Sequence, residues 1–279
     1  MKPTPPIFLA PLLARIDREL IQLLRSLTPE DWQRHTLAGA WTVKDIAGHL
    51  LDGNLRSLSM LRDGYFGDPP DSTENYRDLV GYLNQLNADW VQAYRRISPA
   101  VLIEELERSG REYCAYMESL DPFAPALFSV AWAGESESAN WFHIAREYTE
   151  KWHHQQQIRR AVDQEALLYS KVFYFPYLDT SMRALPHHYR ALTAAPGTCI
   201  QFTIQGAGGG DWFLIWDAKN WNLTVETQAH VDTQLIVPET VAWRIFTKGI
   251  DKKSAIETSE IIGKTALAEP FFDMLAVMA

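Results

Sequence analysis

The chain contains little cysteine. Its 279 residues include two cysteines, Cys114 and Cys199, which lie far apart in segments of different character. Disulfide-stapled secreted proteins use closely spaced, paired cysteines, so this pattern argues against a disulfide framework and fits a reducing compartment. The first twenty residues hold a short apolar stretch that is interrupted by prolines and lacks a small-residue cleavage site, so we expect no export signal. We therefore expect a cytoplasmic protein.

Long hydrophobic runs and an excess of basic charge are also missing. Hydrophobic residues make up 47% of the chain, but no apolar run approaches the ~18 residues of a membrane span. The 26 Lys and Arg are outnumbered by 35 Asp and Glu, and the net charge of -9 is not offset by any basic stripe of the kind that binds nucleic acid. We expect neither a membrane nor a nucleic acid as partner. A monomer or homodimer that binds small molecules is favoured.

Apolar residues recur at helical spacing from residue 8 to about residue 192. Thr28 followed by Pro29, Thr42 followed three residues later by Asp45, and Ser98 followed by Pro99 are N-terminal helix signals. With a short helix after Thr28, the long helices are expected over 8–27, 42–64, 74–97, 98–120 and 138–161. This pattern predicts a helical bundle, followed by a mostly helical segment over 167–192 that prolines kink.

The pattern becomes typical of strands after Pro196. Short runs rich in β-forming residues, separated by Gly, Asp and Asn, predict strands over 198–206, 211–218, 220–227 and 230–238. A further strand is expected over 254–263, and helices over 238–249 and 266–279. The predicted fold class is therefore α+β multidomain, with a helical domain over residues 1–165 and a smaller α+β domain over residues 166–279.

The segment EYTEKWHHQQQIRR, residues 147–160, is unusually polar for a helix that also carries large aromatic residues. At 100° per residue, four polar side chains fall within about 60° of one another. They are His143, Glu147, Glu150 and His154. Trp141, Ala145, Tyr148 and Trp152 lie on the opposite face. We therefore expect this helix to be buried on both sides, with its polar stripe directed into the bundle.

Glu150 and His154 are spaced i and i+4, so their side chains can be aimed at one point. Buried carboxylates and imidazoles are costly unless they are paired or bind a metal, and a structural hydrogen-bonded cluster is the alternative to a metal pair. His153 points about 80° away from His154 on the helical wheel and is expected at the rim. His143 and Glu147 are expected as neighbours of the pair rather than as ligands.

A third candidate ligand comes from the segment WTVKDIAGHLLDGN, residues 41–54. It places His49 in the first half of a helix whose Val43, Ile46 and Leu50 suggest core packing. His49 is therefore expected to face inward as well. One histidine from this helix, with Glu150 and His154 from a later one, would complete a three-ligand site.

Two segments, WTVKDIAGHL at 41–50 and TEKWHHQQQIR at 149–159, resemble the signature segments of the mycothiol-dependent maleylpyruvate isomerase family, within the DinB-like four-helix bundle superfamily. The segments AWRIFTKG and FFDMLAVMA are similar to that family's sterol-carrier-like second domain. The resemblance implies a divalent metal, usually zinc with nickel as a second candidate, held by His49, Glu150 and His154. It also implies an open coordination position for a low-molecular-weight thiol, which could be mycothiol, bacillithiol or glutathione.

A metal of this kind deprotonates a coordinated thiol, and the thiolate can then add to a small electrophile. Addition to a cis double bond, rotation and departure would give cis–trans isomerisation, whereas retention of the thiol would give transfer. We identify no further catalytic or thiol-binding residue from the sequence. The alternative is a non-enzymatic metal-binding protein with a small apolar ligand in the C-terminal domain, near the aromatic residues of its strands, although core packing of those residues is favoured. They are Trp212, Phe213, Trp216 and Trp221.

Overall fold

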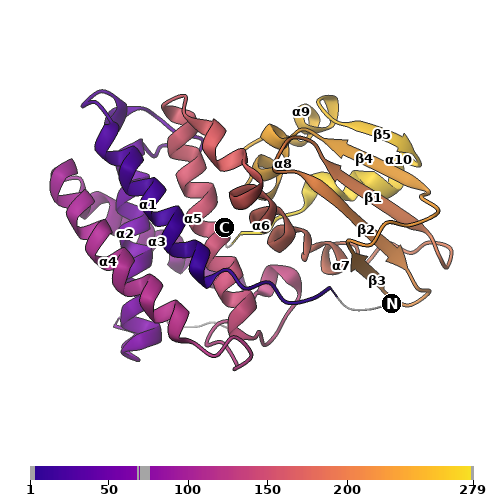
Figure 1. Ribbon diagram of the computed structural model, residues 1–279, viewed down its shortest axis with the longest axis horizontal. Helices are drawn as coiled ribbons and strands as arrows, with labels where there is room; N and C mark the ends of the chain where they lie inside the picture. The colour runs from indigo at the N-terminus through magenta and orange to yellow at the C-terminus, as the bar shows by residue number, and fades with distance from the viewer. Residues whose placement is uncertain (1–3, 68, 70–75, 278–279) are drawn as a thin grey trace.

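Two regions of different secondary structure lie side by side in the computed structural model, which describes residues 4–67, 69 and 76–277. Long helices form the N-terminal region, and a twisted sheet with short helices forms the C-terminal region (Figure 1). The predicted α+β class, with a helical part followed by an α+β part, is confirmed. No helix in the described part of the chain is both long and apolar enough to span a membrane.

In the described part of the helical region, four long helices each pack against two of the others, and a fifth packs against α2 on the outer side. Helix α1 packs against α4 and α5, whereas α2 packs against α4, α5 and the outer helix α3. The bounds are Ala10–Ser26 for α1, Val43–Ser57 for α2, Tyr76–Tyr94 for α3, Pro99–Ser119 for α4 and Asn140–Ala161 for α5. These match the helices expected from the sequence, except that residues 74 and 75 lie outside the described residues. The short helix after Thr28 is a 3₁₀ turn, Asp31–Gln33.

Helix α2, which carries His49, is fixed at both ends. At its start, the Thr42 side chain accepts a hydrogen bond from the Asp45 amide while the Asp45 carboxylate accepts one from the Thr42 amide, which is the predicted capping box. Arg95 also donates to Asp45 at 3.0 Å. The helix therefore begins at a defined residue, and this sets the rotation of His49 about the helix axis.

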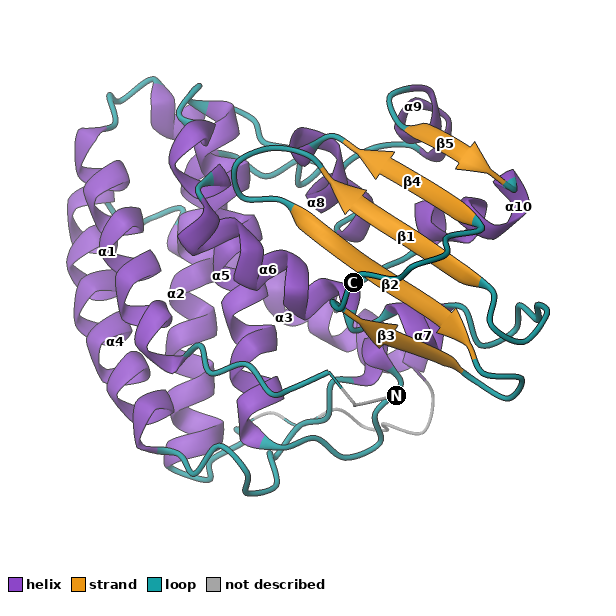
Figure 2. Cartoon of the chain, turned by 45° about the vertical axis from the view of Figure 1, so that its right-hand side comes forward, coloured by secondary structure: helices purple, strands orange, loops and turns teal. Residues whose placement is uncertain are grey.

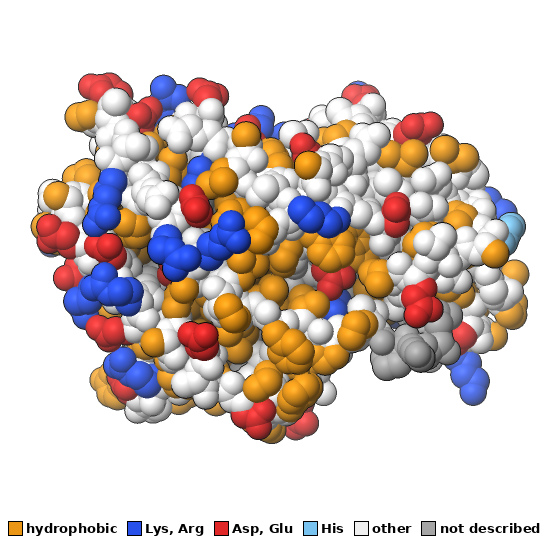
Figure 3. Space-filling model, viewed as in Figure 1, with side chains coloured by type: hydrophobic (Ala, Val, Ile, Leu, Met, Phe, Trp, Pro, Cys, Tyr) orange, Lys and Arg blue, Asp and Glu red, His pale blue; other side chains and the backbone are white. Residues whose placement is uncertain are grey.

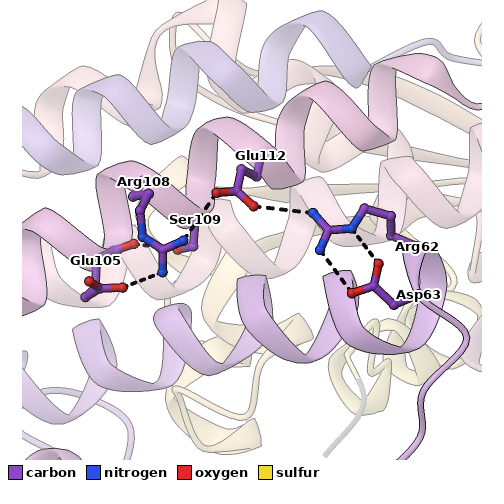
Figure 4. Close-up of polar contacts among 6 residues, drawn as sticks. All are labelled: Arg62, Asp63, Glu105, Arg108, Ser109 and Glu112. Atoms are coloured by element: carbon purple, nitrogen blue, oxygen red, sulfur yellow. Dashed lines mark hydrogen bonds and ion pairs between the residues drawn. The ribbon is translucent and has the colours of Figure 1, made fainter.

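The other end of α2 continues as a π-helical turn, Leu58–Arg62, that is tied to α4 by charged side chains. Arg62 pairs with Asp63 at 2.7 Å and with Glu112 at 3.3 Å, and Glu112 accepts from Arg108 at 3.2 Å (Figure 4). Arg108 in turn pairs with Glu105 at 2.6 Å. Exposed ion pairs contribute little singly, so this chain of pairs mainly fixes the position of the turn against α4.

The C-terminal region begins with helices α6, Lys171–Met182, and α7, Leu185–His188, and then forms a five-stranded sheet in the order β3-β2-β1-β4-β5 (Figure 2). Strand β1 runs parallel to β4, and the other pairs are antiparallel. The strands are Cys199–Ile204, Gly210–Trp216, Trp221–Thr224, Thr233–Val237 and Glu260–Gly263. The first four are the predicted strands. Helix α8, Glu239–Phe246, follows β4, as predicted for the segment 238–249.

Two expectations for the last third of the chain are wrong in part. The strand expected over 254–263 is limited to β5, because Asp251 accepts a hydrogen bond from the Ser254 amide at 2.9 Å and caps a helix, α9, Lys252–Glu257. The helix expected over 266–279 is also shorter. Helix α10, Thr265–Ala268, gives way to a 3₁₀ turn, Glu269–Asp273, that has a proline in its first turn, and residues 278 and 279 lie outside the described residues.

One hydrophobic core joins the two regions through α5 and α6. Trp152 of α5 is fully buried, stacks on Tyr174 and Tyr177 with ring centroids 4.9 and 4.1 Å away, and lies 6.0 Å from Trp243. Core residues of α1 and of the sheet belong to the same cluster. The domain boundary that we predict between residues 165 and 166 falls in the 3₁₀ turn Glu165–Tyr169 after α5, and core packing continues across it.

The aromatic residues of the sheet are core residues. Trp212 donates to Asp179 at 3.0 Å and stacks on Phe175, and Trp221 donates to the Leu192 carbonyl at 2.7 Å. Phe213 and Trp216 are buried as well. These contacts correspond to the packing role that the sequence favours for them.

Candidate metal centre

Helix α5 is buried on both sides, as its sequence predicts. Its apolar face, with Tyr148 and Trp152, contacts the C-terminal region, where the Tyr148 hydroxyl donates to the Phe173 carbonyl at 2.7 Å. Its other faces bury polar side chains, including His143, Lys151 and His154. Buried polar groups need hydrogen-bond partners or a bound ion, so the contacts of these side chains indicate which of the two each one has.

Glu150 and His154 converge as the i, i+4 spacing predicts. The His154 Nε2 atom lies 3.7 Å from Glu150 Oε2. The other ring nitrogen, Nδ1, is 2.9 Å from the Gln157 amide oxygen. Because an amide oxygen only accepts, Nδ1 carries the proton and donates, which leaves the Nε2 lone pair on the side of Glu150. A metal-binding histidine is normally oriented in this way by a partner on its other nitrogen.

His49 of α2 contacts His154. Its ring centroid lies 4.6 Å from that of His154, with the rings nearly perpendicular at 75°, and 5.1 Å from Trp41 on the other side. Its Nδ1 atom is buried and has no hydrogen-bond partner among the residues that the structure describes. A buried imidazole nitrogen without a partner is costly, and binding to a metal would satisfy it. These donors fit a divalent ion.

The electrostatics keep both histidines in the form that binds metals. Burial holds the pKa of His49 well below its usual range, and the nearby His154 and Arg56 lower it further. Burial and then His153 lower the pKa of His154, although the hydrogen bond to Gln157 acts in the opposite direction. Both rings are therefore neutral near pH 7, and a neutral imidazole has a lone pair to give to a metal.

His153 does not lie at the rim, so that expectation is wrong. It is buried, and its ring centroid is 3.9 Å from that of His154. Its Nδ1 atom lies 2.9 Å from the Thr149 carbonyl and 3.9 Å from Glu150 Oε2. In the described part of the chain, Glu150, His153 and His154 form a group whose donor atoms all lie within 4.8 Å of one another. His153 is thus a member of this candidate metal-binding group, which the helical wheel missed, and His49 is not among the three residues of the group.

His143 and Glu147 belong to a separate polar cluster one and two turns earlier on α5. Glu147 accepts a hydrogen bond from the Tyr113 hydroxyl at 2.9 Å and pairs with Arg146 at 2.9 Å. Arg146 also donates to His143 Nδ1 at 3.0 Å. Burial alone would raise the pKa of Glu147, but Arg146, His143 and Tyr113 lower it, so the carboxylate is charged. Glu147 and the Nδ1 atom of His143 are thus engaged within this cluster, whereas His143 Nε2 is buried without a hydrogen-bond partner among the described residues. That the two residues are neighbours rather than ligands stays a prediction.

The arginine Arg56 lies two turns after His49 on α2. Arg56 pairs with Asp52 at 3.1 Å and donates to Asn87 of α3 at 3.3 Å, and its Nη1 atom is buried without a hydrogen-bond partner within the described ranges. Its charge is one of the causes that lower the pKa of His49. No sequence motif points to Arg56, because its position depends on contacts between α2 and α3.

The sequence was compared with models of known protein families. A family model described as the mycothiol maleylpyruvate isomerase N-terminal domain matches residues 13–159, a span that contains His49, Glu150 and His154. No match is found among curated proteins.

Solved structures show weaker likeness. A mutant form of the mycothiol-dependent maleylpyruvate isomerase is 12% identical with a TM-score of 0.49, and another structure of that enzyme is 11% identical with a TM-score of 0.48. Each alignment covers 85% of this chain and 86% of the other. A ubiquinone synthesis protein, UbiJ-SCP2, is 16% identical over 40% of this chain and 90% of its own, with a TM-score of 0.23.

Proposed function

This chain belongs to the mycothiol maleylpyruvate isomerase N-terminal domain family, and on that premise we propose that it is an enzyme that uses a divalent metal and a low-molecular-weight thiol to convert a small electrophile. His49, Glu150 and His154 would hold the metal, with Zn²⁺ favoured and Ni²⁺ as the second candidate. The thiol would be mycothiol, bacillithiol or glutathione. The reaction would be cis–trans isomerisation or transfer of the thiol.

The observation that carries the proposal is the convergence of His154 and Glu150 beside His49. Two imidazoles and one carboxylate make up the three-donor set that catalytic zinc sites use, and such sites keep a further position for a ligand. The 3.7 Å separation between His154 Nε2 and Glu150 Oε2 and the partnerless Nδ1 atom of His49 support this donor set. When bound, the metal would lower the pKa of a coordinated thiol so that the thiolate exists at neutral pH.

The protein's own thiols are poor candidates for the nucleophile. Burial raises the pKa of Cys114 to about 12, with a further contribution from Asp17, and burial also raises the pKa of Cys199 to about 11. Both thiols are therefore protonated near pH 7, whereas the thiolate is the reactive form. Cys199 lies on strand β1, and Cys114 contacts Asp17 at 3.5 Å. These properties support a thiol that is added rather than one supplied by the chain.

Arg56 supports a negatively charged electrophile. Its partly exposed side chain is close enough to influence His49, and its buried Nη1 atom has hydrogen-bonding capacity that no described residue uses. A guanidinium binds a carboxylate through paired hydrogen bonds, so Arg56 would hold a carboxylate of the substrate. Replacing Arg56 with Gln should raise KM for an acidic electrophile more than it lowers kcat.

The test is an activity panel on the metal-loaded protein. Mycothiol, bacillithiol and glutathione are each combined with small electrophiles that include a cis-enone diacid, and loss of free thiol and cis-to-trans conversion are followed. We expect turnover that requires both the added thiol and the metal. Turnover at the same rate without any thiol, or in metal-depleted protein, would contradict the proposal.

A further inference from the structure

A second candidate site lies in the helical bundle, away from the metal centre. A cavity of about 510 Å³ is lined by residues of α1, α2, α4 and α5, and His49, Glu150, His153 and His154 do not line it. Its volume is within the range of small-molecule sites. We infer that this cavity binds a small amphipathic carboxylate, with the apolar part of the ligand inside and the carboxylate at the mouth. The inference does not rest on the proposed function.

The floor of the cavity is a closed polar network. Lys151 is 8% exposed, and its Nζ atom donates to both carboxylate oxygens of Asp17, at 2.9 and 3.1 Å, and to the Asn54 amide oxygen at 2.8 Å. These contacts use all three ammonium donors. Asn54 in turn donates to Ser109 at 3.3 Å. The floor is therefore neutral as a unit, and it does not require a charged ligand group next to it.

The absence of a side chain on Gly110 of α4 provides room for Asp17 and Asn54. A side chain on Gly110 would begin 2.9 Å from Asp17 Oδ2 and 3.6 Å from Asn54 Nδ2. The close approach of α4 to the ion pair thus depends on the missing side chain. Residues on four helices thus contribute to one largely buried ion pair and its hydrogen bonds at the base of the cavity, which is more structure than a chance gap between helices requires.

The walls above the floor are apolar. Leu20 and Ile21 of α1, Leu50 of α2 and Leu106 of α4 line the cavity and are themselves buried. An apolar ligand group placed between them would lose its contact with water, which is the main source of affinity in such sites.

The mouth has an excess of positive charge. Arg18, Arg25 and Arg111 stand against Glu107 and Glu118, so with the neutral floor the lining has one positive charge in excess. Glu107 is shared by Arg25 at 2.8 Å and by Arg111 at 3.9 Å.

Arg18 has no acidic partner in the described part of the chain. Figure 3 shows basic side chains over α1 and α4 on this face, with acidic side chains among them. This charge distribution favours an anionic head group over a cationic one.

The experiment is titration calorimetry of the full chain with decanoate, in metal-loaded and in metal-depleted protein. We expect one decanoate per chain with the same Kd in both forms, and weaker binding of decylamine. Arg18→Glu combined with Arg111→Glu should weaken decanoate binding by about tenfold or more, because charge-assisted hydrogen bonds are lost. Ala14→Trp, which fills the cavity from α1, should abolish it. The matched control Arg96→Glu, on an exposed residue outside the cavity, should leave Kd unchanged.

Three results would overturn the inference. They are absence of saturable decanoate binding, binding that disappears when the metal is removed, and binding that the charge-reversed double variant retains at full strength. The double variant changes only exposed side chains, so its fold can be verified by circular dichroism even if Ala14→Trp fails to fold.

Discussion

The Nε2 atom of His154 lies 3.7 Å from the Oε2 atom of Glu150, one turn earlier on α5. Gln157 helps to fix this geometry, because its side-chain oxygen accepts a hydrogen bond from the Nδ1–H group of His154. The geometry is also held by the surroundings, since burial keeps the imidazole neutral and therefore unable to form a simple ion pair with the carboxylate. Two donors that face each other without neutralising each other are suited to a shared cation.

The first prediction concerns the metal content of a His154 variant. His154→Ala should release the metal, because the remaining donors of the proposed set, His49 and Glu150, chelate too weakly. Elemental analysis of the purified variant should show less than a tenth of the wild-type occupancy. His230→Ala removes an exposed histidine outside α5 and should keep full occupancy. Equal occupancy in the two variants would exclude this ligand set.

The second prediction concerns the residue that orients His154. Gln157→Ala should leave the ligands in place but lower the metal affinity by roughly tenfold to a hundredfold, because the imidazole loses the partner that fixes its tautomer. Competition with a chromophoric chelator measures the affinity. Gln85→Ala, on the exposed side of α3, is the matched control. An affinity within twofold of wild type would show that Gln157 has no such role.

The third prediction concerns the source of the nucleophile. With added thiol, the double variant Cys114→Ala, Cys199→Ala should retain at least about half of the wild-type turnover, because both native thiols are buried and protonated near pH 7. A Tyr189→Phe variant provides a control for a comparable change in buried packing. Loss of turnover in the cysteine variant but not in this control would indicate that a protein thiol takes part.

The fourth prediction concerns stability at acid pH. Burial lowers the pKa of His143 from 6.5 to about 4, with Arg146 acting in the same direction and Glu147 against it. Between these values the unfolded chain binds more protons than the folded chain, so this contribution is complete above pH 6.5 and is lost as the pH falls toward 4. The difference corresponds to about 3 kcal/mol at most.

Urea unfolding of metal-free protein between pH 7 and pH 4.5 tests this contribution. His143→Gln retains an acceptor for Arg146 but cannot titrate, so its free energy of unfolding should fall less steeply with decreasing pH than that of the wild type. His153, whose pKa burial also lowers to about 4, should still contribute in the variant. Parallel pH profiles for the two proteins would contradict the assignment.

The helical wheel predicted the inward stripe of α5 because burial on both faces follows from residue identity alone. It failed for His153, because the wheel gives only the direction of the Cα–Cβ bond. The position of the imidazole ring also depends on the side-chain torsion angles. Its Nδ1 atom bonds to the Thr149 carbonyl one turn earlier, which draws the ring along the helix and against His154. The inward direction of His49 was predicted from the core residues around it and was supported by the family resemblance, whereas its ring contact with His154 comes from tertiary packing.

Local capping decided where the prediction of the fold succeeded and failed. Thr42 and Asp45 fixed the start of α2 in the sequence and in the structure alike. Asp251 also caps a helix, by accepting a hydrogen bond from the Ser254 amide, but the β-forming residues that follow concealed this signal, and the helix was therefore missed. The cavity beside Lys151 could not be predicted, since it depends on the approach of α4 to α1 at Gly110.

Titration of the cobalt-loaded protein with mycothiol, bacillithiol or glutathione tests whether His49, Glu150 and His154 hold a metal with a position open to a thiol. We predict one Co²⁺ per chain and, with at least one of the thiols, a new near-ultraviolet absorption from thiolate bound to cobalt that is absent in His154→Ala. Cobalt-loaded protein that shows no such absorption with any of the three thiols would contradict the account, as would an absorption that His154→Ala retains.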